Sequence, residues 1–236
     1  MANQKGTLFL VPTPIGNMGD ISRRAIEILS DVNTIACEDT RHSGTLMKKL
    51  GLKKKLISYH EFNESSRALQ LIDVLLEGNS IAVITDAGSP GVSDPAYRVV
   101  RAAIDSGIEV VPLPGSSAII PALTASGLPT DRFFFEGFLP NKSGARRTRL
   151  KKLQDIPYTL IFFESPHRVI KCLTDIKTVF GNRQACLARE ITKLHEQFLR
   201  GSINDILKTI SEHSIKGEIV LVIAGDAYKI SREKLS

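Results

Sequence analysis

The first half of the chain alternates short apolar runs with segments of helical periodicity, and this alternation limits the fold more than any other feature. Runs such as "TLFLV" and "SIAVIT" are each followed by a segment whose apolar residues recur every three or four positions, as in "DISRRAIEILSDV". Strands that alternate with helices form parallel sheets, because a parallel neighbour is reached through a crossover helix. Residues 1–126 are therefore predicted to form an N-terminal α/β domain with a mainly parallel sheet.

After the segment "GLPTD", at residues 127–131, the alternation becomes less regular. Strands are predicted for "RFFFEGFL", "YTLIFFE", "RQACLAREI", "EQFLRGS" and "GEIVLVIAG", and helices for residues 165–181 and 203–213. Strands that follow one another without a helix favour antiparallel pairing. Residues 127–236 are therefore predicted to form a C-terminal α/β domain with a mixed sheet.

Three loops share a composition that a simple chain reversal does not need. They are "VPTPIGNMGDIS", "ITDAGSPGVSDPAY" and "VVPLPGSSAII", and each joins an apolar strand to a helix predicted to be capped by Asp or Ser. Ligands of open parallel sheets bind beyond the carboxyl ends of the strands, where glycine permits close backbone approach and helix N-termini offer N–H groups. An ordinary turn explains any one loop equally well, but three on one sheet edge predict a small-molecule site.

The motifs of the commonest nucleotide and metal sites are absent from the sequence. The first loop lacks G-x-G-x-x-G, no G-x-x-x-x-G-K-[ST] occurs, and neither H-E-x-x-H nor paired Cys and His spacing supports a metal. The three cysteines form no C-x-x-C, and no apolar run reaches the roughly 18–20 residues of a membrane span. We therefore expect no metal, no membrane partner and a cytoplasmic location with reduced thiols.

Basic residues are concentrated in two segments of a chain whose net charge is +6. Residues 141–154, "NKSGARRTRLKKLQ", carry six basic residues and no acidic one, and "MKKLGLKKK" carries five lysines. A solvated helix face explains such runs as well as contact with phosphate groups does. The charge therefore permits a polyanionic partner without requiring one.

The loop segments resemble the tetrapyrrole-methylase superfamily of S-adenosylmethionine enzymes. Within it, "ACEDTRHSGTLMKKL", "TDAGSPGVSDP", "FFESPHR" and "KGEIVLVI" are similar to the branch that methylates the ribose 2′-oxygen of a cytidine in the decoding region of 16S ribosomal RNA. The similarity runs from about Thr7 to about Ala224, nearly the whole chain. It implies that S-adenosylmethionine binds in a cleft between the two α/β domains.

The resemblance also implies which residues contact the cofactor. Backbone N–H groups and Ser116 or Ser117 at a helix N-terminus would hold its carboxylate, and Phe163 near its sulfonium would add a cation–π interaction of about 0.5–2 kcal/mol. Many family members have a larger apolar residue in place of Gly91, so its contact is expected from the backbone. The expected cofactor contacts are Ile15, Ser89, Pro90, Gly91, Val92, Ser116, Ser117, Ala118, Phe163, Leu187 and Gly217.

Methyl transfer to a hydroxyl group is accelerated by a base, typically by about 10²–10⁴-fold. The segment "CEDTRH" places Glu38 and Asp39 directly after an apolar strand, and "FFESPHR" places Glu164 at the end of another. Asp39 is the first candidate base, followed by Glu164 and Glu38. The alternative for Asp39 is a local ion pair with Arg41 that only shapes the loop.

The resemblance implies that the partner is 16S ribosomal RNA within the 30S subunit and that the chain forms a homodimer. The expected RNA contacts are Arg41, Lys142, Arg146, Arg147, Arg149, Lys151 and Arg168. Two other functions stay open at this point. One is a small-molecule methyltransferase for tetrapyrrole or precorrin substrates, and the other is a ribosome-associated binding protein without catalysis.

Overall fold

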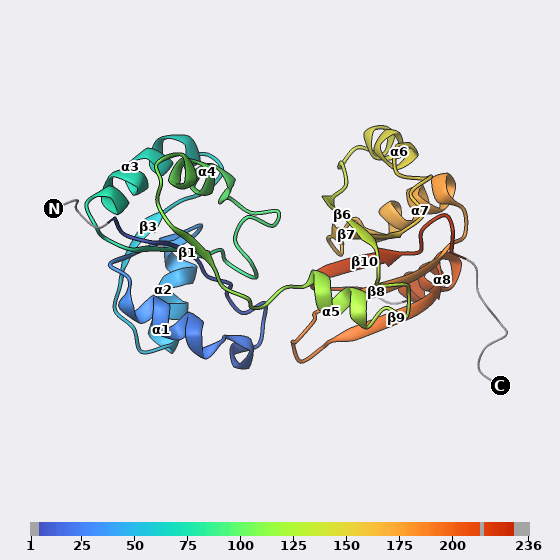
Figure 1. The fold of residues 1–236 in the computed structure, drawn as a ribbon. Coiled ribbons are helices and arrows are strands. Elements are labelled where there is room, and N and C mark those ends of the chain that lie inside the picture. Colours follow the sequence, from blue (N-terminus) through green and yellow to red (C-terminus); the bar gives the residue numbers. More distant parts are fainter. Residues whose placement is uncertain (1–4, 213–214, 229–236) are drawn as a thin grey trace. The chain divides into compact units, whose positions relative to one another are not determined.

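The chain folds into two compact units, each with one five-stranded sheet (Figure 1). The computed structural model describes residues 5–212 and 215–228. Contacts group Met1–Ser117 into the first unit and Ala118–Ser236 into the second. The two α/β domains expected from the sequence are therefore present, and each unit is described by itself below.

The sheet of the first unit is entirely parallel, with the strand order β3-β2-β4-β1-β5. Its strands are β1 (Leu8–Leu10), β2 (Thr34–Cys37), β3 (Lys55–Ser58), β4 (Ile81–Val83) and β5 (Val110–Pro112). Leu8 pairs with Ile81 on one side and with Val110 on the other. The loops that follow β4, β1 and β5 consequently leave the sheet side by side, and the predicted parallel sheet is confirmed.

Helices cover both faces of this sheet. They are η1 (Met18–Asp20), α1 (Arg23–Asp31), α2 (Thr40–Lys49), α3 (Glu64–Leu76) and α4 (Tyr97–Asp105). Figure 1 shows α1 and α2 on one face and α3 and α4 on the other. Leu29 and Met47 pack on the first face, and Leu71 and Val99 on the second. Burying each such side chain contributes about 1.5–3 kcal/mol, so the helices hold the sheet and its loop-bearing edge in place.

The sheet of the second unit is mixed, as predicted, with the order β6-β7-β10-β8-β9. Its strands are β6 (Phe133–Phe138), β7 (Thr159–Glu164), β8 (Gln184–Arg189), β9 (Gln197–Ser202) and β10 (Ile219–Ile223). β6 runs parallel to β7, and every other neighbouring pair is antiparallel. The register of β6 shifts between Phe135 and Gly137, which bends this edge strand.

One face of the second sheet carries a large apolar core. The helices of this unit are α5 (Ile119–Thr124), α6 (Ser143–Lys151), α7 (Val169–Phe180) and α8 (Ile203–Glu212). Leu150 of α6, Leu173 of α7 and Ile206 of α8 share one cluster with Phe162 and Leu221 of the sheet, whereas α5 contacts β10 separately. Within residues 5–212 and 215–228, no helix is long and apolar enough to cross a membrane.

Two predicted helix starts are wrong. The sequence predicts caps at Asp94 and Ser165, but α4 begins at Tyr97 and α7 begins at Val169. The carbonyl oxygen of Ser165 accepts hydrogen bonds from the backbone N–H groups of both Arg168 and Val169, at 3.1 and 3.0 Å. The intervening residues therefore form a turn that precedes the helix, and a capping residue next to proline was not sufficient to place its first turn.

The boundary between the units falls one short helix earlier than the sequence suggests. Because the units divide between Ser117 and Ala118, α5 belongs with the second unit. The domain limits predicted from the sequence, 1–126 and 127–236, place the same helix in the first domain. The predicted limits of the two domains, 1–126 and 127–236, stay a prediction.

Candidate functional site

The three unusual loops of the first unit converge at the carboxyl edge of its sheet. Thr13, in the loop after β1, and Gly88, in the loop after β4, form an isolated antiparallel bridge with hydrogen bonds of 2.9 and 3.0 Å. The buried hydroxyl of Thr13 also donates to the carbonyl oxygen of Thr85 at 2.9 Å. The loops are therefore fixed to one another by backbone contacts, as a ligand cradle requires.

Glycine permits the close approach of the first loop to the third. A Cβ atom placed on Gly115 would lie 2.7 Å from Cβ of Pro12, closer than two carbon atoms can pack. In the second loop Gly88 has φ +89° and Gly91 has φ +84°, backbone conformations that suit glycine. The composition of these loops thus has a direct structural cause, because side chains at these positions would push the loops apart or strain them.

Ser89 to Val92 and Ser116 lie together at this edge. The hydroxyl of Ser89 donates to the carbonyl oxygen of Ser116 at 3.1 Å, and the hydroxyl of Ser116 donates to the carbonyl oxygen of Asp20 at 3.2 Å. In the part of the chain that the structure describes, the backbone N–H groups of Ser89, Gly91 and Ser116 have no hydrogen-bond partner in the protein. These groups can donate to an anionic ligand.

The predicted helix N-terminus behind Ser116 and Ser117 is wrong. α5 begins at Ile119 with Ala118 in the capping position, has six residues and belongs to the second unit. Ser116 and Ser117 therefore lie in loop backbone. Of the other predicted contacts in the first unit, Ile15 is nearly buried, and its Cγ2 lies 3.5 Å from the place of a Cβ on Gly88.

Several carboxylates meet beside these loops. The hydroxyl of Thr85 donates to Oε2 of Glu38 at 3.4 Å, and Oδ1 of Asp86 accepts from the backbone N–H of Asp39 at 3.3 Å. Partial burial raises the pKa of Glu38, and the nearby charges of Asp94 and Asp86 raise it further. Burial likewise raises the pKa of Asp94. Glu38 is thus a carboxylate with enhanced affinity for a proton at the edge where the loops converge.

Asp39, the first candidate base, has a different environment. Its Oδ1 caps α2 by accepting from the backbone N–H of Arg41 at 2.8 Å, and its Oδ2 lies 2.8 Å from Nη2 of Arg41. The hydrogen bonds from Arg41 hold the pKa of Asp39 well below its usual range. Asp39 is therefore a weak proton acceptor that shapes the start of the helix. The Arg41 side chain is 91% exposed, which leaves part of its guanidinium open to an anion.

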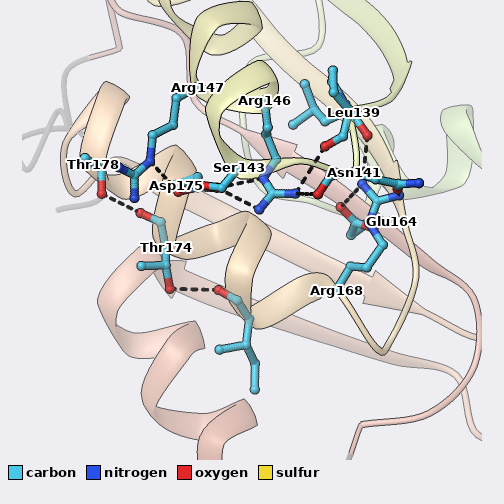
Figure 2. A network of polar contacts seen from close by, with 12 residues as sticks. Leu139, Asn141, Ser143, Arg146, Arg147, Glu164, Arg168, Thr174, Asp175 and Thr178 are labelled. Carbon is cyan, nitrogen blue, oxygen red and sulfur yellow. Dashed lines mark hydrogen bonds and ion pairs between the residues drawn. The ribbon is translucent and has the colours of Figure 1, made fainter.

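Glu164 is buried at the end of β7 in the second unit. Its Oε1 accepts from the backbone N–H of Ser165 at 2.8 Å and lies 3.2 Å from Nε of Arg168. Arg168 also donates to the carbonyl oxygen of Leu139 at 2.7 Å and to the side chain of Asn141. Figure 2 shows Arg168 held between these groups. Both residues are thus engaged in fixing the loop after β6.

The basic segment at residues 141–154 forms α6, whose arginines differ in environment. Arg146 is 3% exposed and binds Asp175 at 2.7 Å and the carbonyl oxygens of Pro140 and Asn141, both at 3.1 Å (Figure 2). Its prediction as an RNA contact is therefore wrong, because the guanidinium faces the protein interior and its partners are internal. Arg147 also pairs with Asp175, but about half of its side chain is exposed.

The remaining basic candidates of α6 lie nearer to solvent. Arg149 pairs with Glu136, with Nη2 2.7 Å from Oε2, while part of its side chain stays exposed. Lys142 and Lys151 are exposed, and neither forms an ion pair within the described residues. Lys142, Arg147 and Lys151 are thus the α6 side chains most available to a polyanion.

The predicted cofactor contacts of the second unit do not form one cluster. Phe163 is half-buried and packs against Phe135 and Phe138, with ring centroids 4.9 and 5.5 Å away. The side chain of Leu187 is fully buried in the core beneath α7 and α8, and its role as a cofactor contact stays a prediction. Gly217 has φ +90° and lies against the side chain of Glu190, where a Cβ atom would collide.

Sequence reasoning missed Thr13, which joins the first loop to the second, and the roles of Thr85 and Asp94, which lie beside Glu38. Their position in the chain offers the clue, since each is a polar residue within the Gly/Pro-rich loops rather than in a helix. Among the described residues, no group of three or more His, Cys, Asp or Glu side chains is placed to hold a metal ion.

Residues 7–207 match the family described as Tetrapyrrole (Corrin/Porphyrin) Methylases. Because this match covers most of the chain, the protein belongs to that family. Proteins named "Ribosomal RNA small subunit methyltransferase I" are its relatives at the sequence level. The relative from Micromonospora olivasterospora is 49% identical over 93% of this chain and 71% of its own length, and the relative from Escherichia coli O157:H7 is 47% identical over 99% and 82%.

Solved structures share the fold at much lower sequence identity. Uroporphyrin-III-C-methyltransferase from Thermus thermophilus superposes with a TM-score of 0.61 at 19% identity, covering 94% of this chain and 93% of that one. The methyltransferase CobJ superposes with a TM-score of 0.68 at 17% identity, covering 95% and 96%. These likenesses establish the two-sheet fold.

Proposed function

We propose that this protein transfers a methyl group from S-adenosylmethionine to the ribose 2′-oxygen of a cytidine in the decoding region of 16S ribosomal RNA. The family and the close relatives make the chain an S-adenosylmethionine-dependent ribosomal RNA methyltransferase. The observation that carries the proposal is the convergence of the three loops with Glu38 at one sheet edge. The nucleotide, the 2′-oxygen and the 30S subunit as substrate are proposed beyond what the relatives' names give.

The loops of the first unit suit the cofactor. The N–H groups of Ser89, Gly91 and Ser116 are available to its carboxylate, and the close contact of Gly115 with Pro12 leaves backbone rather than side chains at the edge. We therefore propose Ile15, Ser89–Val92 and Ser116 as cofactor contacts in this unit. Ser117, Ala118, Phe163 and Gly217 stay candidates on the strength of the family resemblance.

Glu38 replaces Asp39 and Glu164 as the proposed base. Bound S-adenosylmethionine supplies an electrophilic methyl group, and Glu38 takes the proton that the attacking hydroxyl loses. Asp39 is unsuited because Arg41 holds its pKa low, and Glu164 is unsuited because its carboxylate is buried against Arg168. Glu38 combines a raised pKa with a place at the loop edge, the properties that a general base needs.

The basic side chains that remain exposed are proposed to bind the RNA backbone. They are Arg41 in the first unit and Lys142, Arg147 and Lys151 in the second, with Arg149 partly exposed beside them. Lysine and arginine bind phosphates without reading the sequence. These residues would therefore supply affinity, while the assembled 30S subunit supplies the correct target and places the reaction in the cytoplasm.

A homodimer is proposed as the assembly, supported by the exposed apolar residues of α3 and α4. Leu69 is 66% and Tyr97 is 76% exposed, and Leu76 and Ile104 are exposed on the same two helices. Large exposed apolar patches mark association surfaces. Light scattering of the intact protein tests the assembly, and replacing Leu69 and Tyr97 with lysine should shift a dimer to monomer.

The decisive experiment measures transfer of labelled methyl from S-adenosylmethionine to purified 30S subunits. Naked 16S RNA and a uroporphyrinogen-type substrate serve as parallel acceptors. Label at a single ribose, resistant to alkaline cleavage, is the expected result. Label in the tetrapyrrole alone would replace the RNA substrate by a small molecule. Absence of transfer together with absence of cofactor binding in calorimetry would reject the enzymatic proposal in favour of a binding protein.

A further inference from the structure

The solvent face of α2 is basic over its whole length. A helix advances about 100° per residue, so positions 41, 42, 45, 48 and 49 fall within an arc of about 120°. They are Arg41, His42, Thr45, Lys48 and Lys49, and all five are exposed. Leu46 and Met47 point the other way, into the core of the first unit. The helix therefore turns its apolar residues inward and presents only polar and basic groups to solvent.

Apart from the ion pair of Arg41 with Asp39, the charge on this face has no acidic neighbour in the sequence. Residues 40–55, from the start of α2 to the start of β3, contain no Asp or Glu. Lys53 and Lys55 are exposed beyond the end of the helix. Within the described ranges, the side chains of Lys48, Lys49, Lys53 and Lys55 form no ion pair and no hydrogen bond.

Lys54 shows what a structural lysine looks like in the same segment. Its ammonium donates to the carbonyl oxygens of Ser30 and Val32, which ties this segment to the end of α1. The side chains of the four exposed lysines around it make no such hydrogen bonds to the protein. Their charges add nothing visible to the stability of the unit and remain available to a partner.

The position of α2 connects this charge to the candidate site. Asp39 caps the helix directly after Glu38, so the N-terminal end of α2 lies at the loop-bearing edge of the sheet. The helix then runs back along the sheet, as Figure 1 shows. Its 10 residues span about 15 Å at about 1.5 Å per residue. The basic face thus begins beside the proposed base and leads away from it.

We propose that this face is a second binding surface for the phosphodiester backbone of the substrate RNA. The α2 basic face is defined as Arg41, His42, Lys48, Lys49, Lys53 and Lys55. The inference rests on the proposed function, because it extends the same substrate beyond the methylated nucleotide. A polyphosphate chain matches a row of exposed basic side chains in which the four lysines have no ion-pair partner among the described residues. The absence of exposed apolar residues on α2 disfavours an apolar protein partner.

Salt dependence of binding tests the proposal. The intact protein is titrated with 30S subunits and with 16S RNA between 50 and 200 mM salt, as wild type and as Lys48→Gln/Lys49→Gln. Each lost phosphate contact reduces the slope of log K against log salt by about 0.7–0.9, so the double variant should lose about 1.4–1.8. At 0.1 M salt this corresponds to a loss of affinity of about 25- to 60-fold, relative to the 1 M limit where the contacts vanish.

Two matched variants distinguish the effect of the α2 basic face from the effect of the protein's overall charge. Lys177→Gln/Lys208→Gln removes the same charge from exposed positions of α7 and α8 and should leave the slope unchanged. Lys48→Arg/Lys49→Arg should retain wild-type affinity. An unchanged slope in Lys48→Gln/Lys49→Gln, or an equal loss in the α7/α8 control, overturns the proposal while methyl transfer by the wild type upholds the proposed function. If wild type neither binds RNA nor transfers methyl, the proposed function fails and this inference fails with it.

Discussion

Replacing Asp175 by asparagine should destabilise the second unit strongly while leaving its shape almost unchanged. Asp175 is buried and accepts from Arg146 at 2.7 Å, from Arg147 at 2.6 Å and from Ser143 at 2.9 and 3.0 Å. The substitution removes the negative charge, and the guanidinium of Arg146 is then left buried without its counter-ion. Breaking one side of a buried ion pair costs about 3–5 kcal/mol, and we expect a loss of that size in the free energy of unfolding.

Urea unfolding measures this loss when it is followed by circular dichroism and by the accessibility of the buried cysteine thiols of the second unit. Asp105→Asn is the matched control, because its pair with Arg101 is more than half exposed on both sides and should cost less than about 1 kcal/mol. A double variant, Arg146→Met/Asp175→Leu, removes both charges and should recover most of the stability. A loss below about 1.5 kcal/mol for Asp175→Asn, or a double variant no better than the single one, would refute the reasoning.

The same substitution predicts a pH dependence with a definite sign. Burial alone would raise the pKa of Asp175, but the hydrogen bonds from Arg147, Ser143 and Arg146 outweigh it and lower the pKa. A carboxylate with a depressed folded-state pKa stabilises the protein above its unfolded-state pKa of about 3.9 and loses this contribution as the pH falls through the folded-state pKa. The difference between wild type and Asp175→Asn should therefore be constant from neutral pH to about pH 5 and shrink below about pH 4.

Three further outcomes follow from the site. Gly115→Ala should weaken cofactor binding in calorimetry at least several-fold, because the new Cβ would lie 2.7 Å from Pro12; unchanged affinity would contradict the packing of the loops. Glu38→Gln should lower kcat by about 10²–10⁴-fold and abolish the rise of activity with pH through the raised pKa of Glu38, and a retained pH profile would remove Glu38 as the base. Leu187→Ala should reduce the free energy of unfolding by about 2–5 kcal/mol while the Kd for S-adenosylmethionine stays the same, whereas a weaker Kd at full stability would support it as a cofactor contact.

The sheets and the convergence of the three loops at one edge could be predicted from the sequence because each depends on local pattern. Apolar runs and helical periodicity determine where strands and helices form, and the Gly/Pro-rich loops after β1, β4 and β5 converge because parallel strands end at one edge. Helix starts were less accurate. Ser165 and Asp94 have the side chains of capping residues, but the adjacent prolines open turns that delay the first helical residue.

The roles of individual charged residues depended on tertiary contacts that no spacing rule fixes. Glu38 and Asp39 are neighbours in sequence, yet one has a raised pKa and the other a lowered one, because Arg41 reaches only Asp39. Arg146 was misassigned for a reason that the sequence does contain. It precedes Leu150 by four positions, so both lie on one face of α6, and Leu150 belongs to the core. The helical spacing of these two residues, rather than the run of basic residues, indicates that Arg146 is buried.

The place of β1 between β4 and β5 in the first sheet has a consequence for synthesis of the chain. β1 is translated first, yet its neighbours β4 and β5 are completed only after residues 83 and 112 have been made. The contact of Pro12 with Gly115 thus joins the first and last loops of the unit. Nascent chains that end before β5 would leave β1 with one open edge, exposed to pairing with other chains. The edge proposed to bind the cofactor is consequently assembled late, because its three loops are complete only after residue 117 has been made.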